Sequence, residues 1–262
     1  VVDLDWIRSR LPASRPALVA IMAANNETGV LQPWREAQEL CAAAGAPFFC
    51  DATQWCGRLP ARGIGACAFV AGSAHKFGGP RGVGFLKVAG GGPLRPLLHG
   101  GKQLEGRRGG TENVPGVLGM LAALAWCEEQ IAAEAAGQRL AQREQFLAEL
   151  QAAMPATRVN GAGAECLWNT VSVILPETDC RQRWVVKLDK AGVAVSTGSA
   201  CASGSEQPSH VLTAMGLSPG EAGRVVRLSG GWSTTAAEWS EARHAMSRIL
   251  AEWEGGSGNS RS

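Results

Sequence analysis

The stretch that decides the fold reads ACAFVAGSAHKFGGPRGVGFLKV and occupies residues 66–88. Its two ends, residues 66–71 and 82–88, are apolar and are expected to form buried strands. The glycines and the proline between them predict a tight turn that carries Lys76. A lysine at the end of a buried strand is partly desolvated, which favours the neutral amine that forms Schiff bases. Most lysines in turns are solvated surface charges, so the neighbouring residues must decide between the two interpretations.

Two more apolar segments precede this stretch, at residues 17–23 and 47–52. A helical stretch at 33–44 separates them, with Pro33 at its start and Gly45 at its end, as is typical of helix termini. A strand, a helix and a strand in this order form a unit with parallel strands. The sequence therefore predicts an α/β fold with a mostly parallel sheet and flanking helices.

Polar residues follow three of the predicted strands, at 25–26, 51–54 and 73–76. In open α/β sheets, ligands bind outside the carboxyl ends of the strands. We therefore expect these three groups of residues to converge at one ligand site.

A second α/β pattern follows a long helical stretch, which runs over 114–154 with an expected break at Gly137. We predict a large cofactor-binding domain at 1–128, a smaller C-terminal α/β domain at 129–254 and a disordered Gly/Ser-rich tail at 255–262. The strands expected in the smaller domain lie near 170–175, 193–196 and 225–229, and its helices lie near 179–191, 208–215 and 235–254.

Composition narrows the function classes. The 262 residues carry a formal net charge of +2, and the basic residues are scattered, which argues against a nucleic-acid partner. No apolar run is long enough for a membrane span or a signal peptide, so no membrane contact and a cytoplasmic location are expected. Eight cysteines without a C-x-x-C pair predict mostly reduced structural thiols and no metal site. Small-molecule chemistry is the favoured class.

The residues near Lys76 have the chemistry that pyridoxal phosphate requires. The Asp51 carboxylate, at a strand end, can pair with a protonated pyridine nitrogen. Asp51 alone is equally typical of a helix N-cap or a turn, and Asn26 alone is equally typical of an Asx-turn, but their joint occurrence at successive strand ends favours a cofactor site. Asn26 and Gln54 can donate neutral hydrogen bonds to the ring oxygen of the cofactor. The candidate phosphate ligands are Ser73, His75 and Thr111.

Five ordered motifs give the chain a family resemblance. They are NNETG at 25–29, DATQ at 51–54, SAHK at 73–76 with GPRGVG at 79–84, RGGT at 108–111 and STGSAC at 196–201. In this order they resemble the pattern of the cysteine desulfurases, which are class V aminotransferases of fold type I. The resemblance covers nearly the whole chain.

The resemblance implies specific roles. Lys76 would hold the cofactor as a Schiff base and Asp51 would bind the pyridine nitrogen. Gln54 would bond the phenolic oxygen and Asn26 would lie beside the ring. Ser73 and His75 resemble phosphate ligands, and Thr111 resembles the threonine that reaches the phosphate of a partner subunit, which implies a homodimer.

Cys201 lies in a run of small residues, 198–205, that suits a mobile loop. From the residues alone, a catalytic thiol and a tolerated surface cysteine are equally plausible. The resemblance identifies Cys201 as the persulfide-forming cysteine, although Thr197 departs from the family pattern.

The reaction that the resemblance implies starts from free L-cysteine and gives alanine and a persulfide for a sulfur-acceptor protein. Lys76 or His75 would move protons, so His75 is a candidate catalytic residue too. Arg227 resembles the clamp for the substrate carboxylate, and Asn169 would assist it. The sequence does not choose between iron–sulfur cluster assembly and thiolation.

In the family, a segment upstream of the Asn-Asn-Glu motif carries a phosphate loop and a histidine that stacks on the ring. Only 24 residues precede Asn25 here, so the chain resembles an enzyme that lacks its N-terminal part, and weak cofactor retention is expected. Three alternatives stay open. They are another class V enzyme such as a selenocysteine lyase or an aminotransferase, a silent scaffold that binds a sulfur acceptor, and a nucleotide-binding protein, for which 78–84 lacks the required spacing.

Overall fold

The computed structural model describes residues 1–91, 94–133, 135–177, 184–197 and 209–257. The chain forms two compact units. Unit 1 consists of Val1–Ala24 and Gln32–Glu134, and unit 2 consists of Asn25–Leu31 and Ala135–Ser262. The short segment Asn25–Leu31 thus belongs to unit 2, although unit 1 flanks it in sequence. The domain limits expected near residue 128 stay a prediction.

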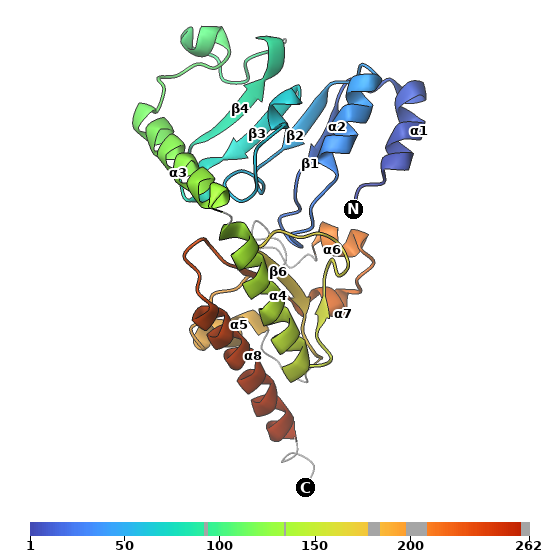
Figure 1. Ribbon diagram of the computed structural model, residues 1–262, viewed down its shortest axis with the longest axis vertical. Coiled ribbons are helices and arrows are strands. Elements are labelled where there is room, and N and C mark those ends of the chain that lie inside the picture. Colours follow the sequence, from blue (N-terminus) through green and yellow to red (C-terminus); the bar gives the residue numbers. More distant parts are fainter. Residues whose placement is uncertain (92–93, 134, 178–183, 198–208, 258–262) are drawn as a thin grey trace. The chain divides into compact units, whose positions relative to one another are not determined.

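Unit 1 is built on a four-stranded sheet in the order β1-β2-β3-β4 (Figure 1). β1, β2 and β3 are parallel, and β4 is antiparallel to β3. This confirms the mostly parallel sheet, and it places the carboxyl ends of β1, β2 and β3 at one edge. The strands span Val19–Met22 (β1), Phe48–Asp51 (β2), Phe69–Ser73 (β3) and Gly84–Val88 (β4).

The described residues of unit 1 form three α-helices, of which α2 contacts both β1 and β2. The predicted helix is confirmed as α2, with Pro33 at its N-cap and Gly45 at a φ of 68°. The sequence analysis did not predict α1, which contains Pro12 and is capped by Asp3 through the Trp6 N–H. The α-helices span Leu4–Ser14 (α1), Trp34–Ala43 (α2) and Val114–Ala132 (α3), and short 3-10 turns span Ile64–Ala66, Ala74–Phe77, Ala89–Gly91 and Gln103–Gly106.

The long helical stretch is divided in a different place from the one expected. α3 ends at Ala132 and α4 spans Ala135–Ala153, so the predicted break at Gly137 is wrong. An interior glycine costs a helix about 1 kcal/mol. The packing of α4 against α8 and β6 tolerates this cost. The Ala-rich sequence at the true boundary contains no stop signal that could have been read.

Unit 2 contains an antiparallel sheet in the order β5-β6-β7. The strands span Arg158–Val159 (β5), Thr170–Ile174 (β6) and Val225–Ser229 (β7), and the helices besides α4 span Trp184–Lys190 (α5), His210–Ala214 (α6), Pro219–Ala222 (α7) and Ala236–Ser257 (α8). β6 and β7 confirm two expected strands. α8 extends three residues into the segment expected to be disordered, and residues 258–262 lie outside the described residues.

The strand expected at 193–196 is not formed. Only Ser196 pairs there, in an isolated antiparallel bridge with Arg227. Val193 and Val195 pack against the core of unit 2, so their alternation reflects burial on that core and not a strand ladder. Residues 179–183 and 208 of two expected helices lie outside the described residues, and α5 and α6 cover the parts that are described.

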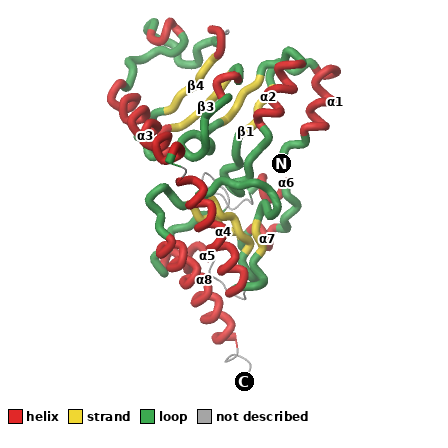
Figure 2. Tube along the Cα trace, viewed as in Figure 1, coloured by secondary structure: helices red, strands yellow, loops and turns green. Residues whose placement is uncertain are grey.

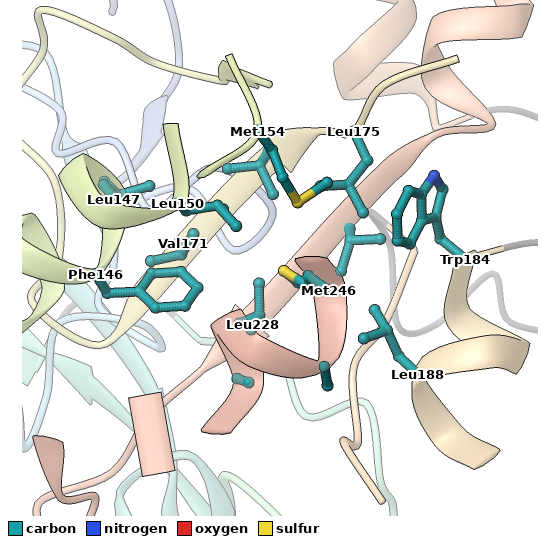
Figure 3. Close-up of a cluster of buried hydrophobic side chains, with 14 of the residues drawn as sticks. Phe146, Leu147, Leu150, Met154, Val171, Leu175, Trp184, Leu188, Leu228 and Met246 are labelled. Carbon is teal, nitrogen blue, oxygen red and sulfur yellow. The ribbon is translucent and has the colours of Figure 1, made fainter. Parts of the chain in front are cut away.

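The core of unit 2 lies between its sheet and the helices α4 and α8 (Figure 3). Leu150 from α4, Met246 from α8 and Val171 from β6 are fully buried members of this core. All five residues of β6 are buried. This packing gives a rigid base to the residues that follow and flank β6 and β7. None of the helices in the described ranges is long and apolar enough to cross a membrane.

Candidate active site

Two neighbouring parallel strands of unit 1 end in predicted site residues. β2 ends at Asp51 and β3 ends at Ser73, and Asp51 is in register with Ala71 of β3. The loop that follows β2 and the 3-10 turn that follows β3 therefore leave the sheet at the same edge (Figure 2). Asp51 is half-buried, and its Oδ1 accepts a hydrogen bond from the Thr53 N–H at 3.0 Å.

Lys76 lies in the 3-10 turn that follows β3. The turn is closed at both ends, since the Ala74 N–H donates to the Val83 carbonyl at 3.0 Å and the Gly79 N–H donates to the Ala74 carbonyl at 2.9 Å. Gly78 has a φ of 87°, which favours glycine at the exit of the turn. Lys76 is half-buried, and no hydrogen bond or ion pair joins its amine to another residue in the described part of the chain. Such an amine is available for covalent chemistry.

Ser73 and His75 form a polar pair beside Lys76. The Ser73 Oγ and the His75 Nδ1 lie 2.9 Å apart, and the histidine side chain is exposed. A hydroxyl and an imidazole in this arrangement can both bind an anion. The structure thus brings together the two residues that were predicted as phosphate ligands.

Gln54 and Thr111 are the other predicted site residues of unit 1. Gln54 is half-buried in the turn after β2, three residues beyond Asp51. Thr111 is exposed and follows Gly110, whose N–H donates to the Gln103 Oε1 at 3.2 Å. No hydrogen bond joins Thr111 to Ser73 or His75 within the described ranges. The role of Thr111 at the phosphate therefore stays a prediction.

The remaining described candidates, Asn26, Asn169 and Arg227, all belong to unit 2. The Arg227 Nη1 donates to the carbonyl of Asn26 at 2.7 Å. Arg227 lies in β7 beside Ser172 of β6, and Asn169 is buried immediately before β6. The Asn169 Nδ2 donates to the Gly230 carbonyl at 3.5 Å. Unit 2 therefore gathers the residues expected to hold the substrate carboxylate.

Two buried charged residues in or next to the predicted motifs were not predicted from the sequence. Glu27 is 1% exposed and accepts a hydrogen bond from the Ser209 Oγ, which caps α6, at 2.5 Å. Arg58 is 9% exposed and donates to the carbonyls of Gln54 and Lys76. Their position inside or next to the NNETG and DATQ motifs was the available signal, but burial cannot be read from the motif itself.

Cys201, and with it the predicted nucleophile loop, lies outside the described residues. Six other cysteines are described, and all six are free thiols. Burial raises the pKa of Cys56 to about 11 and raises the pKa of Cys50 and Cys67 as well. Thiols with raised pKa values stay protonated at neutral pH and are poor nucleophiles. These cysteines are structural.

The residues of unit 1 fit the chemistry of pyridoxal phosphate. An amine without an ion pair among the described residues, a carboxylate at a neighbouring strand end and a hydroxyl–imidazole pair are the groups that an aldehyde, a pyridine nitrogen and a phosphate require. No group of three or more metal-ligating side chains occurs in the described ranges.

Comparisons with known proteins identify the family to which the chain belongs. The family model for class V aminotransferases matches residues 1–240. A cysteine desulfurase of Cereibacter sphaeroides is 40% identical over 239 residues, which cover 90% of this chain and 60% of the relative. A cysteine desulfurase of Klebsiella pneumoniae is 41% identical over 229 residues, which cover 87% of this chain and 57% of the relative.

Solved structures of NifS-like proteins are also similar to this chain. A NifS-like protein of Rickettsia africae superposes with a TM-score of 0.84 at 29% identity, over 95% of this chain and 67% of that one. A second NifS-like protein gives a TM-score of 0.82 at 31% identity, over 96% of this chain and 65% of that one. The chain spans 60% and 57% of the length of the two curated relatives that it matches.

Proposed function

The chain belongs to the class V aminotransferase family, a family of pyridoxal-phosphate enzymes, and on this premise we propose that it carries the catalytic site of a cysteine desulfurase. The observation that carries the proposal is the edge of the unit 1 sheet. There the parallel strands β2 and β3 end in Asp51 and in the turn of Lys76. The names of the relatives support the substrate class, since the relatives at 40% and 41% identity described above are called cysteine desulfurases.

The unit 1 residues bind and orient the cofactor in this proposal. Lys76 holds it covalently through Nζ, and the Asp51 carboxylate keeps the pyridine nitrogen protonated. Gln54 donates to the ring oxygen, while the Ser73–His75 pair binds the phosphate. Bound pyridoxal phosphate supplies an electron sink for the substrate α-carbon.

The unit 2 residues bind the substrate. Arg227 holds the carboxylate of L-cysteine with its planar fork, and Asn169 assists it. The Arg227 Nη1 donates to the Asn26 carbonyl, which orients the side chain. Asn26 itself lies beside the cofactor ring in this proposal.

The chemistry needs one proton carrier and one thiolate. Lys76 Nζ or the His75 ring takes the proton from the substrate α-carbon. The Cys201 thiolate forms an S–S bond with the substrate sulfur, and the carbon–sulfur bond breaks. The electron pair stays with carbon, which takes up a proton and leaves as alanine. The protonated state of the buried cysteines is consistent with a nucleophile elsewhere, and Cys201 is that nucleophile.

An exposed apolar surface supports a homodimer. Leu86, Leu97, Leu98 and Leu104 line a groove of about 670 Å³ next to β4, and Leu97 is 90% exposed. Charged residues, among them Arg95 and Glu105, also line this groove. Exposed leucines next to charged residues are typical of a protein–protein interface. Thr111 follows the same segment, so in our proposal a second copy covers the groove and Thr111 reaches the phosphate of that copy. The persulfide then passes to a sulfur-acceptor protein for iron–sulfur cluster assembly or thiolation.

The test is covalent trapping. The protein is mixed with pyridoxal phosphate and reduced with borohydride, and its peptides are mapped by mass spectrometry. We expect a pyridoxyl group on Lys76 and its absence in Lys76→Arg. An adduct spread evenly over exposed lysines such as Lys102, with none enriched at Lys76, contradicts the cofactor role.

A second variant separates a desulfurase from an aminotransferase of the same family. Cys201→Ala should abolish release of sulfide from cysteine, and the intact protein should no longer gain one sulfur atom in its mass. The trapped adduct on Lys76 should persist in this variant. Undiminished sulfide release from Cys201→Ala would exclude the desulfurase assignment and leave the cofactor site intact.

A further inference from the structure

Arg58 is a buried cation that bridges the two turns of the unit 1 site. Its Nη1 donates to the Gln54 carbonyl at 3.0 Å, and its Nη2 donates to the Lys76 carbonyl at 2.7 Å. The first acceptor lies in the turn after β2, and the second lies in the turn after β3. Burial lowers the pKa of Arg58 to about 10, so the guanidinium remains charged at neutral pH.

A second contact joins the same two turns. Gly57 has a φ of +71°, and a Cβ at this position would lie 2.4 Å from the Cβ of Phe77, the residue after Lys76. The Cys127 Sγ of α3 donates to the Phe77 carbonyl at 3.4 Å. The turn of Lys76 is therefore packed between the turn after β2 and α3, with no space for a side chain at Gly57.

We propose that Arg58 is a positioning residue that fixes the turn of Lys76 relative to Asp51 and Gln54. Turns beyond strand ends leave carbonyl oxygens outside the sheet ladder, and buried carbonyls need donors. A planar guanidinium donates in two directions at once, whereas an ammonium is a compact point charge. The role of Lys76 in this inference rests on the proposed function, but the bridge between the turns does not.

The experiment compares Arg58→Met with Arg35→Met. Methionine keeps an unbranched apolar stem and removes every donor. Arg35 is a matched control in the same unit, because its Nη2 donates to the Arg62 carbonyl at 2.8 Å. The first readout needs no cofactor. It is hydrogen exchange at the amides of Gly78 and Gly79, which both donate to the Ala74 carbonyl.

Exchange at these amides should be about tenfold faster in Arg58→Met and unchanged in Arg35→Met, since a lost charged donor destabilises the turn locally. The second readout is the amount of pyridoxyl group trapped on Lys76 at a fixed cofactor concentration. It should fall about tenfold in Arg58→Met. Arg58→Lys should lie between, with a loss of about threefold, because one ammonium does not span both carbonyls.

The outcomes are distinguishable. Unchanged exchange in a folded Arg58→Met protein would overturn the bridge, and faster exchange with full trapping on Lys76 would overturn the positioning role. Absence of the adduct from the wild-type chain would refute the proposed function, whereas hydrogen exchange still tests the bridge. If Arg58→Met does not fold, Arg58→Lys takes its place in both measurements. Wild-type exchange rates and wild-type trapping in Arg58→Lys would then overturn the inference.

Discussion

Replacing Arg227 should separate a structural from a substrate-binding contribution of one side chain. Its Nη1 donates to the Asn26 carbonyl at 2.7 Å, and its backbone pairs with Ser172 and with Ser196. The backbone pairing survives any substitution except proline. Arg227→Lys and Arg227→Ala therefore change only what the guanidinium does.

The expected changes in the free energy of unfolding and in KM depend on the hydrogen bonds that the guanidinium makes. A charged donor to a carbonyl contributes about 1.5–3 kcal/mol, so Arg227→Ala should lower the free energy of unfolding by about this amount. Arg227→Lys should recover part of it, because an ammonium can still reach one carbonyl. Two charge-assisted bonds to a carboxylate are not reproduced by lysine, so KM for cysteine should rise about 10- to 100-fold in Arg227→Lys.

The assay measures KM for cysteine from alanine production, and urea denaturation gives the free energy of unfolding. Arg224→Lys is the matched control, since Arg224 lies in the same unit and donates to the Leu175 and Gly220 carbonyls. It should lose stability and keep the wild-type KM. A wild-type KM in Arg227→Lys, with stability lowered, would refute the carboxylate role and leave only the contact with Asn26.

Three other predictions concern stability, pH and assembly. Glu27→Ala withdraws the buried acceptor of the Ser209 Oγ and should cost about 1–3 kcal/mol in urea denaturation; an unchanged midpoint would show that the contact is dispensable. Hydrogen bonds from Ser218, and then from Arg158, lower the pKa of Glu221 from 4.5 to about 2, so its stabilisation is complete above pH 4.5 and is lost as the pH falls towards 2. Thermal melts of Glu221→Gln should therefore show a flatter decline than the wild type across that window, and parallel curves would contradict the assignment. Leu97→Glu should shift the mass seen by light scattering from dimer to monomer, and an unchanged mass would exclude the groove as the interface.

The strand positions of unit 1 and two strands of unit 2 could be predicted because they depend on local apolar patterns. β2 runs from Phe48 to Asp51 and β7 from Val225 to Ser229, as the patterns indicate. The position of the break between α3 and α4 could not be predicted, since helix-forming residues occupy both sides of it. Gly137, the residue that suggests a break, lies inside α4. The strand predicted at 193–196 was wrong for a related reason. Burial on a core and pairing in a sheet produce the same alternation of apolar and other residues.

The site was predictable to the extent that its residues sit at strand ends. Asp51, Ser73 and Lys76 lie at one edge because the parallel pairing of β2 and β3 follows from the chain order. The place of Asn26 was not predictable in the same way. Its segment, Asn25–Leu31, packs in unit 2, where the Leu31 N–H donates to the Glu165 carbonyl. That contact joins residues more than a hundred positions apart, which no local pattern encodes.

The arginines show why sequence reading misses supporting residues. Isolated arginines are ordinarily assigned to the surface, and their side chains carry no apolar pattern. In both units, however, arginines donate to backbone carbonyls at or beyond the ends of strands. Arg58 donates to those of Gln54 and Lys76, and Arg143, which is 4% exposed, donates to that of Thr170, the first residue of β6. Catalytic turns are built from backbone that leaves the sheet, so their carbonyls need donors that the sheet cannot supply. A buried guanidinium is the side chain with enough donors, in a rigid enough geometry, to satisfy several of them.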